Sequence, residues 1–371
     1  MNLKIGIVGL PNVGKSTLFN ALTNAGALAA NYPFATIEPN VGIVPVPDER
    51  LDTLAKMYDT DKKVPATVEF VDIAGLVKGA SQGEGLGNKF LAHIRECQAI
   101  CHVVRAFKSG DIVRADNKPE DDIVAQAKDD IDIINLELQL ADEETRAKVE
   151  AKRKKSPEDD LIPYLTDKPV IYMFNVDEDG LTDQNLQDSL RRLVNGIHGK
   201  HPFVSASTTA TRTGDVPLGD PRRACEDGGK KARQNPSEAA AVFVNAKLEE
   251  EMSGMSREER KEFLKSYGVE HDALEELIKA AYETLGLQSF LTAGKKECRA
   301  WTIKQGSTAP EAAGTIHTDF ERGFIAANIC NFDDLAKYGS EQAVKAAGKL
   351  RTEGKTYVMQ DGDVVEFKFN V

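Results

Sequence analysis

The sequence has few cysteines, no long apolar run and no charged leader segment. Its five cysteines are scattered and odd in number, which excludes a disulfide framework and suits a reducing compartment. No apolar run approaches the length that spans a bilayer, and the N-terminus enters a strand-like segment at once, without a cleavage site. These absences predict a soluble protein of the cytoplasm.

Charge and length set two further limits. The formal net charge of −12 argues against indiscriminate binding to nucleic acid or anionic membrane, although it leaves room for a local basic patch. A chain of 371 residues is too long for one hydrophobic core, so two or three domains are expected.

The N-terminal segment carries the strongest motif. An apolar run over residues 3–8 predicts a buried strand, and the loop Gly9-Leu10-Pro11-Asn12-Val13-Gly14-Lys15-Ser16-Thr17 follows it directly. Apolar residues then recur at helical spacing, so strand, glycine-bounded loop and helix form the context of a phosphate-binding loop.

The residue types in this loop suit a nucleoside triphosphate. Gly9 and Gly14 allow the backbone to curl so that successive N–H groups face phosphate oxygens, and the helix adds its dipole. Lys15 supplies a charge for the β- and γ-phosphates, and the Ser16 hydroxyl can complete a Mg²⁺ coordination shell. We therefore expect bound nucleotide and Mg²⁺ here.

Two later segments contain candidate ligands of the metal and the γ-phosphate. Two prolines keep residues 31–40 out of a helix, so Thr36 in this loop is a candidate second hydroxyl ligand of Mg²⁺. The strand-like run at 68–71 ends at Asp72, whose carboxylate is expected to reach the metal through water. Gly75, three residues later, can donate its N–H to the γ-phosphate.

The residues after this motif indicate slow hydrolysis. Leu76 occupies the position where a glutamine would orient the attacking water, and a leucine side chain cannot do so. Four glycines within residues 79–87 predict a segment that becomes ordered when nucleotide or a partner binds.

A candidate base-recognition segment, Asn175-Val176-Asp177-Glu178, follows the apolar run at 169–174. In a guanine-specific protein this box is Asn-Lys-x-Asp, in which the Asp binds guanine and the Lys packs on the ring. Here Val176 replaces the Lys, and Glu178 moves the carboxylate by about one bond length, which hydrogen-bond geometry tolerates poorly. Adenine therefore becomes a candidate base, and a plain turn at a strand end is the alternative.

These motifs together resemble those of the YchF/Obg-like ATPase family of translation-factor-class P-loop proteins, over residues 1–142 and 168–371. The resemblance implies Mg²⁺-dependent hydrolysis of ATP, with relaxed or reversed base preference. By the same match, Asn12–Thr17 and Val176 contact ATP, and Ser16 and Thr36 hold Mg²⁺. Ala246-Lys247 match the last base-side element of the family.

The resemblance also implies partners. It predicts association with the ribosome, through the large subunit and ribosomal RNA, with no membrane partner and a monomeric state. K⁺ is a candidate activator.

One catalytic position departs from the family. Its members usually carry a histidine, implicated in hydrolysis, in the loop where this chain has Arg114. A guanidinium cannot act as a base, but it can stabilise phosphoryl charge as an arginine finger does. Arg114 therefore joins Lys15 and Gly75 as a candidate catalytic residue, and an ordinary surface loop residue is the alternative.

The fold class expected is α/β: a Ras-like P-loop domain, an inserted helical arm of coiled-coil type, and a C-terminal β-grasp domain of the TGS kind. We assign residues 1–120 and 169–286 to the nucleotide-binding domain, with a flexible insertion at 199–238. The arm takes residues 121–168 and the TGS domain residues 287–371.

The arm and the C-terminal domain carry candidate RNA contacts. The arm has a heptad-like seam formed by Ile131, Ile134, Leu138, Ala141 and Thr145. Its basic cluster at 152–155 is either an RNA contact or a solvated helix end. The TGS domain has a candidate basic face formed by Lys295, Lys296, Arg299, Lys304 and Arg322. The alternative is that these are ordinary solvated surface residues. Trp301 is expected in the core.

The sequence leaves three functional hypotheses. The first is a slow ATPase that a ribosomal partner stimulates in the control of translation and stress responses. The second is a nucleotide-gated ribosome- or RNA-binding switch with negligible turnover, and the third is a GTPase.

Overall fold

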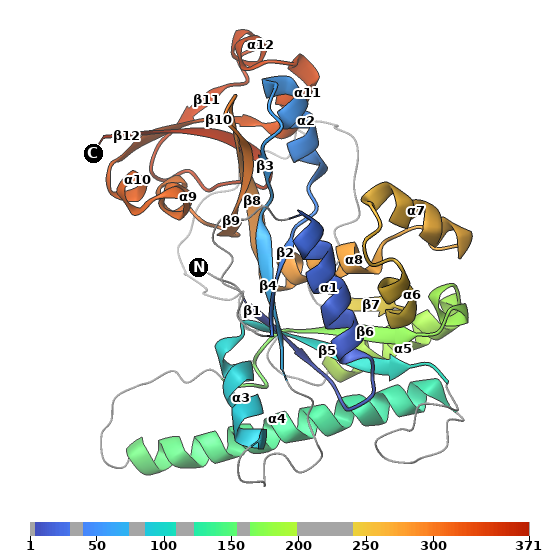
Figure 1. Ribbon diagram of the computed structural model, residues 1–371. Helices are drawn as coiled ribbons and strands as arrows, with labels where there is room; N and C mark the ends of the chain where they lie inside the picture. Colours follow the sequence, from blue (N-terminus) through green and yellow to red (C-terminus); the bar gives the residue numbers. More distant parts are fainter. Residues whose placement is uncertain are drawn as a thin grey trace, which may run out of the picture.

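The computed structural model describes residues 4–29, 40–73, 86–108, 122–153, 164–198 and 240–370. Its strands form two six-stranded sheets, which lie at opposite ends of the molecule in Figure 1.

The first sheet surrounds the N-terminal strand. Its strands, in spatial order, are β2 (Val41–Pro45), β4 (Thr67–Asp72), β1 (Lys4–Val8), β5 (Ala99–Ala106), β6 (Val170–Val176) and β7 (Ala240–Val244). β2 pairs antiparallel with β4, and the other neighbours pair in parallel, which confirms the expected mixed, mainly parallel sheet. The carboxyl ends of parallel strands share one edge, where such sheets bind ligands.

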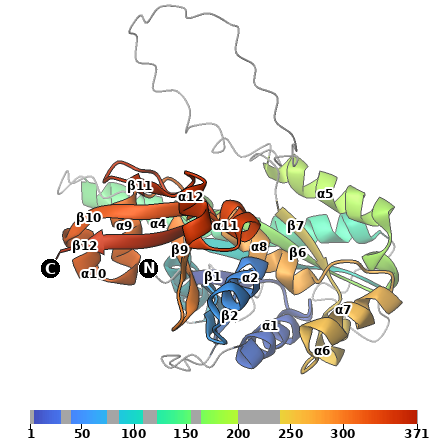
Figure 2. The same ribbon diagram turned by 90° about the horizontal axis from the view of Figure 1, so that it is seen from above.

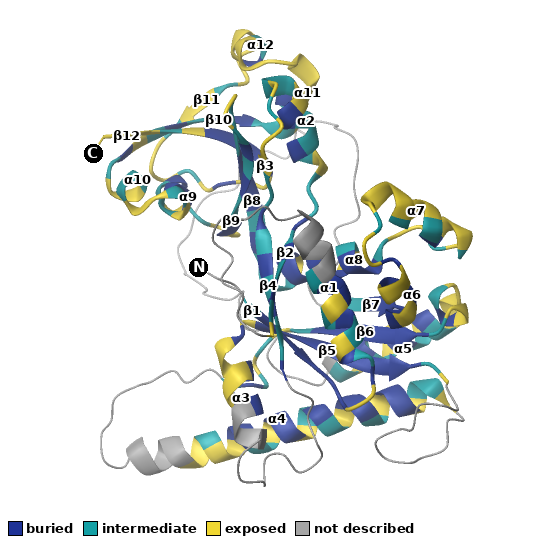
Figure 3. Ribbon diagram, in the orientation of Figure 1, coloured by how far each residue is buried: buried dark blue, intermediate teal, exposed yellow. Residues whose placement is uncertain are grey.

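Helices cover both faces of this sheet. They are α1 (Lys15–Ala29), α3 (Leu86–Glu96), α4 (Ile123–Arg153), α5 (Gln184–His198), α6 (Ala246–Glu251), α7 (Arg257–Ser266) and α8 (Ala273–Thr284), with a 3₁₀ turn η1 (Asp179–Leu181). Figure 1 shows α1 and α8 on one face and α3 and α4 on the other. Every residue of the central strand β5 is buried, as a strand covered on both faces requires (Figure 3).

The long helix α4 differs from the arm expected from the sequence. It has 31 residues and therefore extends about 46 Å. The seam residues Ile131, Ile134 and Leu138 are at most 4% exposed, and α4 packs against β5. The carboxylate of Asp142 accepts hydrogen bonds from the backbone N–H groups of Leu165 and Thr166 at 2.9 Å, which ties the returning chain to the helix.

Up to Asp142, the seam residues of α4 therefore pack against the sheet and do not form a projecting coiled coil. Spacing alone cannot separate the two, because a sheet-packed helix and a short coiled coil share the same apolar period. The side chains of the basic cluster at 152–155 and the whole insertion at 199–238 lie outside the described part of the chain.

The second sheet contains the C-terminal strands. Its order is β11 (Arg351–Glu353), β10 (Phe324–Asn331), β12 (Asp363–Phe369), β8 (Leu287–Ala293), β9 (Cys298–Lys304) and β3 (Lys63–Val64). Its helices are α9 (Ala309–Ile316), α10 (Thr318–Arg322), α11 (Phe332–Tyr338) and α12 (Glu341–Ala346). Without β3 this is the β-grasp order, in which the last strand, β12, lies parallel to the first, β8.

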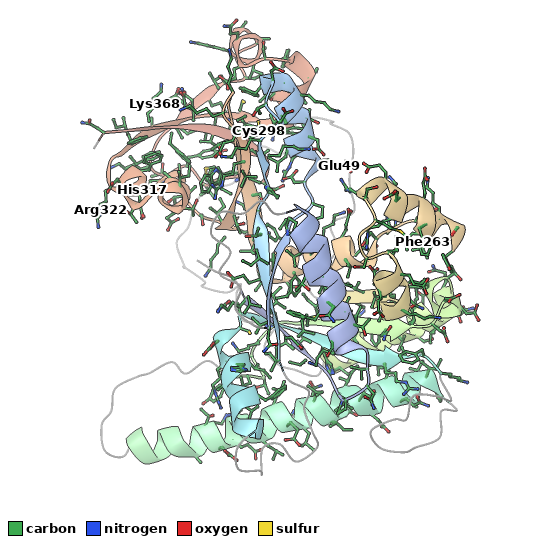
Figure 4. All side chains as sticks on the ribbon, viewed as in Figure 1. Glu49, Phe263, Cys298, His317, Arg322 and Lys368 are labelled. Carbon is green, nitrogen blue, oxygen red and sulfur yellow. The ribbon has the colours of Figure 1, made fainter. Side chains whose placement is uncertain are left out.

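The sequence makes two predictions for this domain, one on the position of Trp301 and one on a basic face. Trp301 packs against the core under α9, as predicted, and its indole N–H donates to the hydroxyl of Thr292 at 2.9 Å. The Arg299 guanidinium lies over the Trp301 ring at 3.8 Å, so it packs along the sheet rather than projecting into solvent. Arg322 is exposed at the outer end of the domain, near His317 (Figure 4).

The chain between β2 and β4 leaves the first sheet and joins the second, although the sequence boundaries place it in the nucleotide-binding domain. It contains α2 (Glu49–Tyr58) and β3, which pairs in parallel with β9. Arg50 of α2 donates to the carboxylate of Asp361 at 2.8 Å, and the other oxygen of Asp361 accepts from the Ser289 N–H at 2.9 Å. Leu54 is fully buried in the same interface.

Candidate nucleotide-binding site

The phosphate-binding loop connects β1 to α1 at the carboxyl edge of the first sheet. Backbone φ is +65° at Asn12 and +91° at Gly14, so the loop turns through left-handed conformations that expose consecutive N–H groups. A Cβ at Gly14 would lie 2.4 Å from the Asn175 amide nitrogen, so a larger residue would push the loop and that side chain apart. The loop lines a cavity of about 480 Å³ formed by Leu10, Pro11, Asn12, Gly14, Lys15, Ser16 and Thr17.

Lys15 and Asp72 meet at this edge, although 57 positions separate them in the chain. β1 and β4 are paired in parallel with Ile7 opposite Asp72, which places the end of β4 beside the start of α1. The Lys15 ammonium forms a short ion pair with the Asp72 carboxylate, and Lys15 is only 9% exposed. The structure thus brings together a predicted phosphate-binding residue and a predicted metal-binding residue that the sequence assigns to separate motifs.

The Asn175 side chain joins two segments of the site through hydrogen bonds within the protein. Its amide N–H donates to the Val13 carbonyl at 3.0 Å, and its amide oxygen accepts from the Ala246 N–H at 3.0 Å. Asn175 is 5% exposed, so both ends of the amide are used inside the protein. It connects the phosphate loop to the base-side loop, and we infer that it positions both loops.

Val176 and Glu178, the two residues of the candidate base-recognition segment that differ from the guanine-specific pattern, differ in their exposure. The Val176 side chain is 2% exposed and packs in the core with Phe174 and Leu190, so the only groups it can offer a nucleotide are those of its backbone. Glu178 is exposed, and its carboxylate makes no cap hydrogen bond at the start of η1. Of these two residues, Glu178 therefore presents its side chain to solvent and Val176 does not.

The base-side loop begins with a residue that the sequence analysis did not single out. The Asn245 side-chain oxygen accepts from the N–H groups of Lys247 and Leu248, both at 3.0 Å, and so caps α6. Asparagine before a helical run is a common N-cap, so this signal was present in the sequence. Ala246 is buried, and the Lys247 side chain is exposed.

Three candidate site residues lie outside the described part of the chain: Thr36, Gly75 and Arg114. Leu76 lies outside it as well.

The described residues fit a Mg²⁺ ion. Ser16 is exposed at the start of α1 and lines the phosphate-loop cavity. Asp72 pairs with Lys15, the residue that precedes Ser16 in the chain. Both offer hard oxygen donors, and Mg²⁺ characteristically takes one or two protein oxygens and completes its shell with phosphate and water.

This fold and this loop define a P-loop nucleotide-binding protein of the Ras-like type. A family model described as "50S ribosome-binding GTPase" matches residues 4–175. The C-terminal model for YchF GTPases, described as "Protein of unknown function (DUF933)", matches residues 287–370.

Whole-chain comparisons specify the family. The chain is 46% identical over 384 residues to the "Ribosome-binding ATPase YchF" of Bacillus subtilis, covering 100% of both proteins. It is 39% identical over 410 residues to "Obg-like ATPase 1" of Pongo abelii, covering 100% of this chain and 93% of that protein. The solved structure of the Schizosaccharomyces pombe YchF GTPase has 33% sequence identity and a TM-score of 0.77, covering 99% of this chain and 98% of that one. The chain belongs to the YchF family.

The helices were also compared with the requirements of a bilayer. Among the residues described, none of the helices combines the length and the apolar character needed to cross a membrane.

Proposed function

We propose that this protein binds ATP with Mg²⁺ at the Gly9–Thr17 loop and hydrolyses it slowly, as a regulatory switch associated with the ribosome. The observation that carries the proposal is the junction of Lys15, Asp72 and the curled loop at one sheet edge. Relatives of matching length named as ribosome-binding ATPases support the ATP and ribosome assignments.

The phosphate end of the site would work by position and charge. N–H groups at the start of α1 face the phosphates, and the Lys15 ammonium turns from the Asp72 carboxylate toward the β- and γ-phosphate oxygens. Ser16 and Thr36 would hold Mg²⁺, with Asp72 reaching it through water. When bound there, Mg²⁺ neutralises the charge that develops between the β- and γ-phosphates.

Turnover would be slow because the attacking water lacks a side-chain base. Leu76 cannot orient this water, and the proposed contributions come from Lys15, the Gly75 N–H and Arg114 acting on phosphoryl charge. Ordering of residues 79–87 would report nucleotide state to the ribosome, through its large subunit and RNA, with K⁺ as activator. The protein would act as a monomer in the cytoplasm.

The purine box supports adenine over guanine. Val176, which is buried in the core, replaces the lysine whose stem packs on a guanine ring, and Glu178 offers a longer carboxylate than the guanine-binding Asp. GTP is the second candidate, because the similar Schizosaccharomyces pombe structure is named a GTPase.

Competition calorimetry tests the proposal directly. Purified protein with Mg²⁺ is titrated with ATP and with GTP, and phosphate release is followed with and without ribosomes. We expect tighter binding of ATP and release that ribosomes accelerate. Exclusive binding of GTP would refute the base assignment, and nucleotide-dependent ribosome binding without any release would favour the pure switch.

A further inference from the structure

A charged cluster outside the phosphate site, with one buried and two partly buried members, joins three helices. Arg260 of α7 donates to the carboxylate of Glu249 of α6 at 2.7 Å and to that of Asp272 at 2.8 Å. Asp272 is also the N-cap of α8, where it accepts from the N–H groups of Leu274 and Glu275. Exposed side-chain fractions are 12% for Arg260, 3% for Glu249 and 17% for Asp272.

The cluster is chemically unusual because two carboxylates share one guanidinium. Asp272 also accepts two hydrogen bonds from backbone N–H groups at the start of α8. Burial, followed by the nearby Asp272 charge, raises the pKa of Glu249 to about 7. Removing one member would leave the others buried without their partner, so the arrangement holds the helices in one relative position.

The cluster acts on the helix that begins with the base-side loop. The Glu249 N–H donates to the Asn245 carbonyl at 3.0 Å, so Glu249 lies one turn after Asn245, the N-cap of α6. On its other side this loop is held by the hydrogen bond from the Ala246 N–H to Asn175. Figure 2 shows α6 next to both α1 and α7, so the first turn of α6 is fixed between the phosphate loop and α7.

A second cavity adjoins this helix. It measures about 260 Å³ and lies between α1 and α6, lined by Thr17, Asn20, Ala21, Glu250 and Ser253. Thr17 also lines the phosphate-loop cavity, so the two spaces share a wall residue. A shift of α6 would therefore move Ala246 and Lys247, which are expected on the nucleoside side of the site, whereas Lys15 and the N–H groups predicted to bind phosphate belong to α1 and the loop before it.

We propose that Arg260, by holding Glu249 to Asp272, positions the base-side segment 245–247, which is the N-cap and first two residues of α6, and sets the affinity of the protein for the nucleoside part of its nucleotide. The three residues are positioning residues, since they contact α6 and α8 and not the nucleotide. The inference rests on the proposed function for its ligand, ATP.

The test compares ATP with inorganic tripolyphosphate, which presents phosphates without a base or sugar. Calorimetry with Mg²⁺ is run on full-length wild type, Arg260→Ala, Glu249→Ala and Glu249→Gln. The matched control is Arg257→Ala, which removes an arginine on the same helix that pairs with Glu275 and Glu49 instead. Thermal melting verifies that each variant is folded.

We expect Arg260→Ala and Glu249→Ala to lower the affinity for ATP by about tenfold or more, where tenfold corresponds to about 1.4 kcal/mol. The affinity of both variants for tripolyphosphate should stay within about twofold of the wild-type value. Glu249→Gln retains an oxygen acceptor for Arg260 and should bind ATP within about twofold of wild type, as should the Arg257→Ala control.

Equal losses for ATP and tripolyphosphate, or unchanged ATP affinity in both alanine variants, would overturn the proposal. Failure of Glu249→Gln to rescue ATP binding would overturn it as well. Wild-type protein that binds GTP and not ATP would instead refute the proposed substrate, and the same contrasts measured with GTP would still decide the role of Arg260.

Discussion

Replacing Asn175 by alanine separates a positioning role from a base-binding role. The substitution removes the donor to the Val13 carbonyl and the acceptor of the Ala246 N–H, both at 3.0 Å. Val13 and Ala246 are 3% and 6% exposed, so water cannot easily replace the lost partner at either group. The two loops that meet at Asn175 would lose their direct connection.

The expected magnitude follows from these two buried groups. An unsatisfied buried backbone group costs about 1–3 kcal/mol, so the loss of two partners should lower the free energy of unfolding of ligand-free protein by about 2–6 kcal/mol. A residue that only contacted the base would leave the stability of the ligand-free protein unchanged. Affinity for tripolyphosphate should also fall, because the Val13 carbonyl belongs to the phosphate loop.

Urea unfolding of the ligand-free protein measures the first effect, and calorimetry with tripolyphosphate and Mg²⁺ measures the second. Asn185→Ala is the control, since Asn185 is an exposed asparagine near the start of α5. The reasoning is refuted if Asn175→Ala unfolds at the same urea concentration as Asn185→Ala and binds tripolyphosphate equally well.

Three further substitutions test other parts of the structure. Lys15→Ala should lower ATP turnover by about 10²–10³-fold because it removes a charge aimed at the transferred phosphate, and undiminished phosphate release would contradict that role. Arg50→Ala should lower the free energy of unfolding by about 1 kcal/mol through loss of the hydrogen bond to Asp361, whereas Lys128→Ala, on the exposed side of α4, should unfold like wild type in the same denaturation assay. Glu249→Gln should unfold with a different pH dependence from wild type. Because burial raises the carboxyl pKa of Glu249 from 4.5 to about 7, its ionisation destabilises the wild-type fold progressively from pH 4.5 to about 7. The free energy of unfolding of the variant, relative to that of wild type, should therefore rise by on the order of 3 kcal/mol between pH 4.5 and about 7, and should not rise further above pH 7. A difference between the two proteins that stays constant at every pH would contradict the assignment.

Several features were predictable because the residues that determine them are neighbours in the chain. The phosphate loop needs only a strand, two glycines, a lysine and a helix in succession, and the structure has this arrangement from β1 to α1. The position of Asp72 at the end of a strand beside this loop was also predicted, and the structure places its carboxylate against Lys15.

Other features were missed because their patterns are ambiguous along the chain. The seam of α4 has the same spacing whether it packs on a sheet or on a second helix, and only the position of β5 decided between them. The sequence predicts Asn175 as a nucleotide contact, but it does not show that the same side chain bonds the Val13 carbonyl and the Ala246 N–H, because these groups lie far apart in the chain.

The sequence by itself determined the chemistry of the phosphate loop and the periodicity of most strands and helices, because backbone conformation and burial pattern depend on adjacent residues. Tertiary structure alone decided that Lys63–Val64 pairs with β9, that Arg50 reaches Asp361, and that Arg260 joins Glu249 to Asp272. Each of these contacts joins separate elements, and two of them link residues more than two hundred positions apart. Their formation therefore depends on how the folded layers pack, which local pattern does not specify.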